Sequence, residues 1–476
     1  MEKLQGRIHF IGIGGAGMSA IAKILLQLGY SVSGSDIKLS PITKKLEGMG
    51  AVVYEGHQGS NVEGAGTVVI STAINLTNPE LIAAKELGIT VLHRADVLAE
   101  IMQPRHSIAV AGAHGKTTTT SMIALVLEYN KLDPTVIVGG ELSYIGGNAK
   151  LGQSNFLVAE ADESDGSFLK LTPKTVVITN IEDDHLDHYG TLENIMQAFR
   201  EFASKVADSG TVVCCTDDSN VRQLINELPN QSYITYGLNE QADYTVQNIQ
   251  IQGTNTAVDV YYQGQLLGKL ELQVPGMHNL VNALAAVAVG REAGLDFADI
   301  ANALGEFRGV SRRFQTMGDV LGVRIVDDYA HHPTEIHATL NAARSAGFQR
   351  VVAVFQPHRY SRTKFLYKEF GKVFGPADEI IINDIYAACE LPIEGVSANL
   401  IVDEIEKNEG RSVHYIPTLE DTVDYLAEHV QPGDIVLTMG AGNVWTVGTK
   451  LNEQLMMKEA NVCESPEPQL RTGQGY

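Results

Sequence analysis

Residues 109–120, AVAGAHGKTTTT, combine the residue types and the spacing that can hold a phosphate chain. They end an apolar, strand-like run and lead into a segment with helical apolar periodicity. In a strand, turn and helix of this kind, successive backbone N–H groups and the positive end of the helix dipole point at one anion. Gly115 lets the backbone approach a phosphate, Lys116 reaches the β- and γ-phosphates, and the Thr117 hydroxyl ligates magnesium. This pattern predicts an ATP site.

The spacing of the loop differs from the common phosphate-binding loop, G-x-x-x-x-G-K-[ST], which would place a glycine where Val110 stands. A glycine turn that only caps a helix is the alternative. That alternative does not explain why Gly-Lys-Thr-Thr directly follows an apolar strand. We therefore favour the ATP interpretation, and the predicted ATP-binding residues of this loop are Gly112, Ala113, His114, Gly115, Lys116, Thr117 and Thr118.

Two acidic stretches follow, each at the end of an apolar run. VAEADESDGSF places Glu160 at the end of one strand, and TNIEDDHLDHYG places His185 just after the next. Ligands of open α/β sheets bind beyond the carboxyl ends of the strands, so these side chains should converge near the ATP loop. Carboxylates suit magnesium, and a neutral imidazole can complete the site, so we predict Thr117, Glu160 and His185 as metal ligands. A solvated acidic loop remains the alternative, above all for Asp183, Asp184, Asp187 and His188.

A second glycine-rich loop, IGIGGAGMS, lies near the start of the chain. Gly12, Gly14 and Gly17 satisfy G-x-G-x-x-G after a strand-like run and before a helix-like segment, and Asp36 follows 19 residues beyond Gly17. Alone, this loop suggests a dinucleotide cofactor such as NAD. The loop itself requires only a diphosphate, so another diphosphate-bearing ligand fits it as well.

The whole chain alternates strand-like and helix-like segments, which predicts parallel sheets with crossover helices. A linker is expected at 102–106, and residues 243–275 form shorter, polar-interrupted strands typical of an antiparallel meander. The predicted fold class is α/β, with three consecutive domains: a Rossmann-like N-terminal domain, a central phosphate-loop domain with a small antiparallel sheet, and a Rossmann-like C-terminal domain. The expected bounds are 1–103, 104–309 and 310–458, followed by a polar, disordered tail at 459–476.

Composition narrows the class of protein further. The 476 residues are 44% hydrophobic and 19% charged, which is typical of a well-packed globular protein. A formal charge of −22 opposes general nucleic-acid binding. The four cysteines (Cys214, Cys215, Cys389 and Cys463) show no metal spacing and favour a reducing compartment. With no signal peptide and no membrane-spanning run in view, we expect a cytoplasmic protein.

The motifs GAHGKTTTT, EADESD, NIEDDHLDHY, GMHNLVNALAA, RRFQ, DDYAHHPTE and FQPHRYSRT occur in this order. Together they resemble the Mur ligases of peptidoglycan assembly, most closely the alanine-adding branch, over residues 1 to about 458. The resemblance implies that the N-terminal domain binds a UDP-sugar, the central domain ATP, and the C-terminal domain an amino acid. It also implies that ATP phosphorylates the carboxylate of UDP-N-acetylmuramate to an acyl phosphate, which the amine of L-alanine then attacks.

The resemblance assigns further residues. The alternatives are a helix-start residue for Asn279, an ordinary polar position for Asn282 and surface charges for the residues of the C-terminal domain. With ATP placed in the second domain, we favour the first loop as a UDP-sugar site over NAD. The implied UDP-sugar residues are Gly12, Gly14, Gly15, Ala16, Gly17, Asp36, Ser71 and Thr72. Those implied near ATP are Asn279 and Asn282, beside the adenine, together with Arg313 and Asp328. Those implied for the amino acid and acyl phosphate are Tyr329, His331, His358, Arg359 and Arg362. The implied catalytic set is Lys116, His185, His331 and Arg359.

One departure from the family pattern concerns a second magnesium. Several sister ligases carry a carbamylated lysine shortly after the DHxDxY segment, but here TLENIMQAFREF has no lysine and Phe199 is nearest to that place. Alternatives at the level of function are a ligase that attaches a whole tripeptide to the same UDP-sugar, a folylpolyglutamate synthetase, a nucleotide-driven switch and an NAD-dependent oxidoreductase. We expect small-molecule substrates, no nucleic-acid or membrane partner, and a monomer or weak homodimer.

Overall fold

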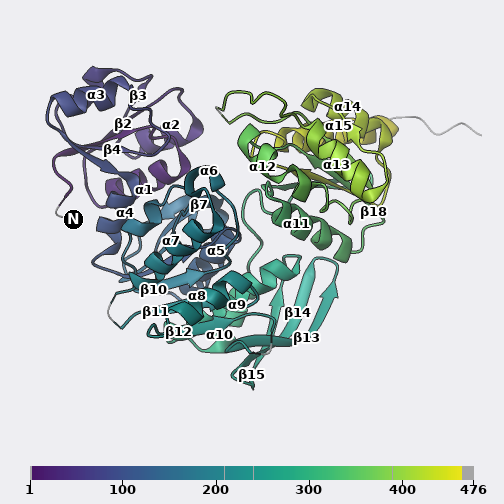
Figure 1. Cartoon of the computed structure of the whole chain (residues 1–476), viewed down its shortest axis with the longest axis horizontal. Helices are drawn as coiled ribbons and strands as arrows, with labels where there is room; N and C mark the ends of the chain where they lie inside the picture. Colours follow the sequence, from purple (N-terminus) through teal and green to yellow (C-terminus); the bar gives the residue numbers. More distant parts are fainter. Residues whose placement is uncertain (1–2, 208, 240, 389, 464–476) are drawn as a thin grey trace, which may run out of the picture. The chain divides into compact units, whose positions relative to one another are not determined.

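The computed structural model describes residues 3–463 except 208, 240 and 389. The chain divides into two compact units, residues 1–311 and 312–476. Three sheets run through it, two in the first unit and one in the second (Figure 1). The predicted fold class, three consecutive α/β domains, is confirmed.

The N-terminal domain is a parallel five-stranded sheet in the order β3-β2-β1-β4-β5. The order reverses at β1, so a ligand site is expected at the carboxyl ends of β1 and its neighbours. The elements are β1 (Arg7–Ile11), α1 (Ala16–Gln27), β2 (Val32–Asp36), α2 (Pro41–Gly48), β3 (Val52–Glu55), η1 (Gly59–Val62), β4 (Ala65–Ile70), α3 (Pro79–Glu86), β5 (Thr90–His93) and α4 (Arg94–Met102).

The central domain contains a ten-stranded sheet in the order β15-β14-β13-β12-β11-β10-β6-β9-β7-β8. Its first elements are β6 (His106–Ala111), α5 (Lys116–Tyr129), β7 (Thr135–Leu142), η2 (Ser143–Ile145), β8 (Gly147–Lys150), β9 (Phe156–Glu160), η3 (Ser167–Lys170), β10 (Thr175–Ile178), α6 (Leu186–Tyr189) and α7 (Leu192–Ser204). The later ones are β11 (Thr211–Cys215), α8 (Ser219–Glu227), β12 (Tyr233–Tyr236), β13 (Tyr244–Gln252), β14 (Asn255–Tyr262), β15 (Gln265–Leu272), α9 (Met277–Glu292) and α10 (Phe297–Gly305).

The predicted meander is present as β13, β14 and β15, which pair antiparallel. It is not a separate small sheet, because Tyr236 of β12 pairs parallel with Tyr244 of β13 and joins the meander to the large sheet. Asp243 strengthens this junction by accepting hydrogen bonds from the backbone and side chain of Thr235. The antiparallel strands therefore extend the ten-stranded sheet of the central domain.

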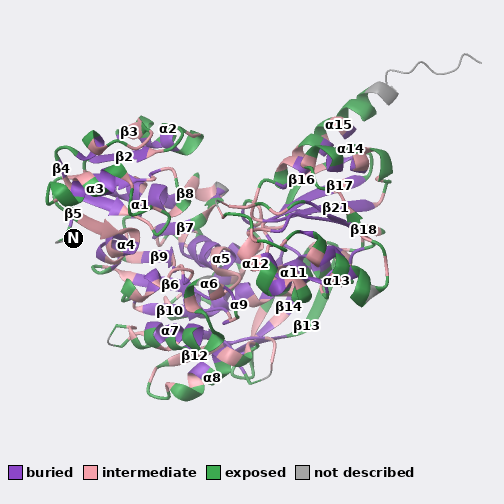
Figure 2. Cartoon of the chain, turned by 45° about the horizontal axis from the view of Figure 1, so that its top comes forward, coloured by how far each residue is buried: buried purple, intermediate pink, exposed green. Residues whose placement is uncertain are grey.

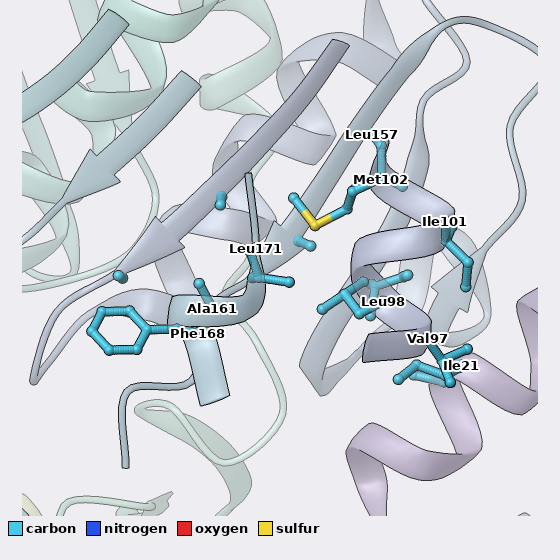
Figure 3. Packing of buried hydrophobic residues seen from close by; sticks show 14 of the residues in the cluster. Ile21, Val97, Leu98, Ile101, Met102, Leu157, Ala161, Phe168 and Leu171 are labelled. Atoms are coloured by element: carbon cyan, nitrogen blue, oxygen red, sulfur yellow. The ribbon is translucent and has the colours of Figure 1, made fainter. Parts of the chain in front are cut away.

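The first two domains share one hydrophobic core. Helix α4 of the N-terminal domain buries Val97, Leu98 and Ile101 in the same cluster as Leu157 of β9 and Phe168 of η3 in the central domain (Figure 3). Burial of apolar area contributes about 25 cal/mol per Å², so a continuous core opposes separation of these domains. The two domains therefore belong to one compact unit.

The C-terminal domain is a six-stranded sheet in the order β16-β17-β21-β18-β19-β20, parallel except for the edge strand β16. Its four central strands, β17, β21, β18 and β19, are mainly buried, and the outer faces of its helices are mainly exposed (Figure 2). The elements are β16 (Gln315–Val320), β17 (Val323–Asp328), α11 (Pro333–Ser345), β18 (Arg350–Phe355), α12 (Tyr360–Phe370), β19 (Glu379–Ile382), α13 (Asn399–Glu409), β20 (His414–Tyr415), α14 (Leu419–His429), β21 (Asp434–Met439) and α15 (Trp445–Cys463).

The last helix extends further than the sequence pattern indicates. Helix α15 runs through residues 459–463, where we expected the polar tail to begin, and the rest of the expected tail lies outside the described residues. Cys214 and Cys215 are buried and free, whereas Cys389 lies outside the described residues. Within the described chain, no helix combines the length and the apolar character needed to cross a membrane.

Candidate functional site

The turn between β6 and α5 contains two glycines at positions where a side chain would be strained. The φ angles of Gly112 and Gly115 are 138° and 81°, in the region that favours glycine. A Cβ at Gly112 would lie 2.1 Å from Thr179 Oγ1, and one at Gly115 would lie 2.7 Å from Asn282 Oδ1. Because α5 has no side-chain cap at its start, its first N–H groups are left to bind an anion.

Side chains at the end of β10 hold this phosphate loop in place. The His114 backbone N–H donates to Asn180 Oδ1 at 2.8 Å, and its carbonyl accepts from Thr179 Oγ1 at 2.6 Å and from Asn180 Nδ2 at 3.0 Å. The loop is therefore fixed before any ligand binds. Sequence reasoning did not single out these two residues, although Thr-Asn directly follows the apolar run of β10.

Lys116 lies against its own loop and against an acidic side chain from the β9 end. Its Nζ donates to the carbonyls of Gly112 (2.6 Å) and Ala113 (3.0 Å) and to Glu163 Oε1 (2.8 Å). Burial alone would lower the pKa of Lys116, but the neighbouring carboxylates Glu163 and Glu160 outweigh it and raise the pKa. The ammonium group is therefore charged and can be redirected to a phosphate.

The Thr117 hydroxyl and the Glu160 carboxylate meet as predicted for a magnesium site. Thr117 Oγ1 donates to both Glu160 oxygens at 3.1 and 3.0 Å, and the Gly139 N–H donates to Glu160 Oε2 at 2.8 Å. Burial raises the pKa of Glu160, although Lys116 opposes this effect. A divalent cation would relieve the burial of this carboxylate, and the hard oxygen donors match magnesium.

Glu163 connects Lys116 to His185, the third predicted metal ligand. His185 Nε2 lies 3.6 Å from Glu163 Oε1 and 3.5 Å from Asp184 Oδ2. Burial would lower the pKa of His185, but the interactions with Glu163 and Asp184 outweigh it and raise the pKa. Within the described chain, Glu163 Oε2 is buried without a hydrogen-bond partner. Glu163 was not among the predicted site residues, although the EADESD motif contains it.

The remaining acidic residues of this region differ in burial. Asp183 and His188 are exposed, as a solvated loop requires, whereas Asp184 is buried and accepts the His185 N–H at 2.8 Å. The Asp187 side chain lies outside the described residues. Phe199, at the place of the family's modified lysine, is buried and packs against Phe168, with 5.4 Å between ring centroids.

The two predicted asparagines of α9 have different surroundings. Asn282 lies against the phosphate loop at Gly115 and accepts a hydrogen bond from Thr119 Oγ1 at 3.1 Å. Asn279 donates to the Pro275 carbonyl at 2.7 Å at the start of the helix. Asn282 therefore contacts the phosphate end of the predicted ATP site, whereas the contact of Asn279 is local.

The predicted UDP-sugar residues gather at the carboxyl edge of the first sheet. The glycine-rich turn follows β1, Asp36 ends β2, and Ser71 and Thr72 follow β4, which are three neighbouring strands. Asp36 Oδ2 accepts the Gly14 N–H at 2.8 Å, and Thr72 Oγ1 donates to Asp165 Oδ2 of the central domain at 3.1 Å. The turn runs through Gly12, Gly14, Gly15, Ala16 and Gly17, and α1 begins without a side-chain cap.

In the C-terminal domain, Asp328 and Tyr329 lie at the end of β17 beside Arg313. Asp328 accepts the backbone N–H groups of Phe314 and Ala330, each at 2.7 Å. Burial raises the pKa of Asp328 to about 6, although Arg313 opposes this effect. The guanidinium groups of Arg312 and Arg313 lie 5.0 and 5.2 Å from the Tyr329 ring centroid, within cation–π distance.

The other predicted residues of this domain form a basic cluster. His331 Nδ1 lies 2.9 Å from the Tyr329 carbonyl, and its ring centroid lies 6.0 Å from that of His358. His358 Nδ1 lies 3.2 Å from Arg362 Nη1, and Arg359 is the N-cap residue of α12. Burial, reinforced by both arginines, lowers the pKa of His358 to about 4, so its imidazole is neutral at pH 7. The cluster is suited to carboxylate or phosphate.

The fold and the phosphate loop define a nucleotide-binding α/β protein with a second glycine-loop domain. Three family models match consecutive parts of the chain: "Mur ligase family, catalytic domain" (residues 7–106), "Mur ligase middle domain" (110–290) and "Mur ligase, glutamate ligase domain" (312–442). The chain therefore belongs to the Mur ligase family.

Individual relatives cover nearly the whole length. The chain is 58% identical over 456 residues to UDP-N-acetylmuramate–L-alanine ligase of Pelotomaculum thermopropionicum, covering 96% of this chain and 98% of the relative. The crystal structure of UDP-N-acetylmuramate-alanine ligase from Thermotoga maritima is 30% identical with a TM-score of 0.81, covering 95% of this chain and all of the other. The UDP-N-acetylmuramate:L-alanyl-γ-D-glutamyl-meso-diaminopimelate ligase of Neisseria meningitides is 31% identical with a TM-score of 0.60, covering 65% of this chain and all of the other.

Proposed function

We propose that this chain joins L-alanine to the carboxylate of UDP-N-acetylmuramate at the expense of ATP, in peptidoglycan synthesis. The observation that carries the proposal is the contact cluster of Lys116, Thr117, Glu160 and Glu163 at the phosphate loop. It lies in one compact unit with the first glycine loop. We assign residues 1–103 to the UDP-sugar, 104–309 to ATP and 310–458 to the amino acid. Full-length similarity to alanine-adding relatives supports this assignment.

In the first proposed step, a carboxylate oxygen of the muramyl group attacks the γ-phosphorus of ATP. The bond from the γ-phosphorus to the bridging oxygen breaks, and ADP leaves with that oxygen. The N–H groups at the start of α5 and the Lys116 ammonium stabilise the negative charge on the phosphates. Asn282, which lies against Gly115, keeps the loop in this geometry.

In the second proposed step, the amine of L-alanine attacks the acyl carbon. A tetrahedral intermediate forms, the bond from the acyl carbon to the phosphate oxygen breaks so that phosphate leaves, and the amine nitrogen gives up a proton to solvent. The C-terminal cluster supplies the cations for this step, because guanidinium groups bind carboxylates and phosphates through two parallel hydrogen bonds. We propose that Arg359 and Arg362 hold the anionic groups, and that His331 lies near the reacting amine.

Magnesium fits the residues beside the phosphate loop. Thr117 and Glu160 offer a hydroxyl and a carboxylate within hydrogen-bond distance of each other. When bound, the metal would neutralise charge on the phosphates. His185 can join this set only after it loses its proton, because an imidazolium cannot ligate a metal.

The other functions have less support. A tripeptide-adding ligase is represented by a relative that is 31% identical over 65% of this chain, against 58% identity over nearly the full length for the alanine-adding relative. An NAD-dependent oxidoreductase does not need a second phosphate loop with acidic strand ends. A formal charge of −22 opposes a nucleic-acid partner, and the ATP requirement favours a cytoplasmic reaction.

The test is an assay of ligation with purified protein. ATP, UDP-N-acetylmuramate and L-alanine are combined, phosphate release is measured, and the UDP-linked product is identified by mass. We expect phosphate release to require all three substrates and to match product formation one to one. Release that does not depend on the amino acid would contradict the proposal, and turnover with the tripeptide but not with L-alanine would favour the tripeptide-adding ligase.

A further inference from the structure

The EADESD motif after β9 has two faces with different partners. Glu160 and Glu163 contact the phosphate loop through Thr117 and Lys116. The two aspartates of the motif contact the N-terminal domain instead: Asp162 accepts from Arg94, and Asp165 accepts from Thr72. The motif therefore lies between the proposed ATP and UDP-sugar sites, and only its first face is explained by ATP binding.

Arg94 is the basic residue that contacts both aspartates of the motif. It begins α4 directly after β5, and its Nη2 lies 2.7 Å from Asp162 Oδ2 and 3.8 Å from Asp165 Oδ2. The side chain is 17% exposed. Its Nη1 points to the first turn of α1, since a Cβ at Gly17 would lie 3.5 Å from Nη1. The guanidinium therefore lies beside the glycine-rich turn.

A cation beside this turn would offset the negative charge of a diphosphate. The turn supplies backbone N–H groups, but Asp36 brings a carboxylate to it and already occupies the Gly14 N–H. Two lysines in this part of the domain, Lys23 and Lys45, donate to the carbonyls of Ala149 and Gly146 in the central domain. Among the described residues, Arg94 makes its hydrogen bond and both of its ion pairs with Nη2. The N–H groups of Nη1 can therefore bind another anion.

We propose that Arg94 binds the diphosphate of the UDP-sugar through Nη1 and that Asp162 and Asp165 position its guanidinium. This inference rests on the proposed function and adds a binding residue to it. The fork of an arginine suits this geometry, because one nitrogen can stay on Asp162 while the other meets a phosphate oxygen. A lysine, with a single nitrogen, cannot meet both partners in the same way.

The test is calorimetry on the full-length chain with UDP, which has the diphosphate but lacks the muramyl carboxylate. We compare wild type with Arg94→Met and Arg94→Lys. Lys170→Met is the matched control: Lys170 Nζ lies 2.7 Å from Asp96 Oδ2, so it also ties α4 to the central domain, but through a different residue of the helix. We expect the affinity for UDP to fall about tenfold or more in Arg94→Met and less in Arg94→Lys, consistent with a charge-assisted hydrogen bond. Lys170→Met should bind UDP as wild type does.

The outcomes separate this inference from the proposed function. If wild type binds neither UDP nor UDP-N-acetylmuramate, the proposed function fails. If wild type binds UDP and Arg94→Met binds it within twofold, or if Lys170→Met loses as much affinity, Arg94 only ties the domains together and the inference is wrong. A loss that affects UDP-N-acetylmuramate but not UDP would assign Arg94 to the carboxylate and would overturn the diphosphate contact.

Discussion

At the scale of single residues, Glu163 is the acidic partner of Lys116 at the phosphate loop. It is buried, pairs with Lys116 at 2.8 Å and lies 3.6 Å from His185. A phosphate that binds the loop competes with Glu163 and with two backbone carbonyls for the lysine ammonium. Phosphate binding therefore involves an exchange of partners as well as new contacts.

The first prediction concerns Lys116→Met. Loss of the ammonium removes the charge that meets the transferred phosphate, so kcat should fall by about 10²- to 10³-fold. The variant also leaves a buried carboxylate without its partner, which costs about 3–5 kcal/mol of stability for a fully buried pair. The double variant Lys116→Met/Glu163→Gln should recover thermal stability but not activity. Near-normal turnover in a folded variant would refute the ATP assignment.

The second prediction concerns Glu160→Gln and His185→Ala. If both side chains serve the metal beside the phosphates, each variant should lose activity and should need more magnesium for its remaining activity. The exposed Asp183 provides the control, and Asp183→Asn should leave the magnesium titration unchanged. An unchanged titration together with a lowered thermal midpoint would indicate that Glu160 and His185 are structural.

At the scale of elements, the same design occurs twice. Helices α1 and α5 each follow a buried parallel strand and have a glycine as the N-cap residue, so no side chain caps the helix start. Because the N–H groups of the first turn have no partner within the helix, such a start is suited to an anion. The sequence predicts both starts, since glycines between an apolar run and a helical pattern are visible without a structure.

The third prediction concerns the first of these loops. A Cβ at Gly14 would lie 2.8 Å from Asp36 Oδ2 and 3.2 Å from Thr43 Cγ2, so Gly14→Val should distort the turn. We expect KM for UDP-N-acetylmuramate to rise by about tenfold or more while KM for ATP and L-alanine stays within about twofold. Gly48→Val is the control, because a Cβ there meets nothing within 4 Å. Equal increases in all three KM values would show a general loss of structure, and tight NAD binding by wild type would overturn the ligand assignment.

Some elements are not predictable from local pattern. Strand β8, which pairs antiparallel with β7, is one example, because GGELSYIGGNAK is short, glycine-rich and without clear alternation. The junction of the meander with the large sheet depends on one pairing, Tyr236 with Tyr244. Pairing across a sheet edge is decided by tertiary contacts that no residue pattern specifies.

The candidate site also contains residues that can be predicted from the sequence and residues that cannot. Residues of the glycine turns and strand ends, such as Lys116, Thr117 and Glu160, are visible from the sequence because their role follows from position in a strand–turn–helix unit. Glu163 and Arg94 are not, because their partners lie 47 and 68 residues away in the chain. Only packing between elements shows which carboxylate of EADESD faces which domain.

At the scale of the whole molecule, the proposed UDP-sugar and ATP sites belong to one compact unit with a shared core, and the proposed amino-acid residues belong to another. The two proposed chemical steps differ in which of these residues they use. We propose that phosphorylation uses the sugar and ATP sites of the first unit together with Arg313 and Asp328 of the second, and that amide formation also uses the cluster around His358.

The most direct test of the account is transfer of an oxygen label. UDP-N-acetylmuramate labelled with ¹⁸O at both carboxylate oxygens is incubated with the enzyme, ATP and L-alanine, and the released phosphate is analysed by mass. The proposed mechanism predicts one ¹⁸O atom in each phosphate, because the carboxylate oxygen bonds to phosphorus and the carbon–oxygen bond later breaks. Unlabelled phosphate alongside ligated product, or label in AMP, would contradict it.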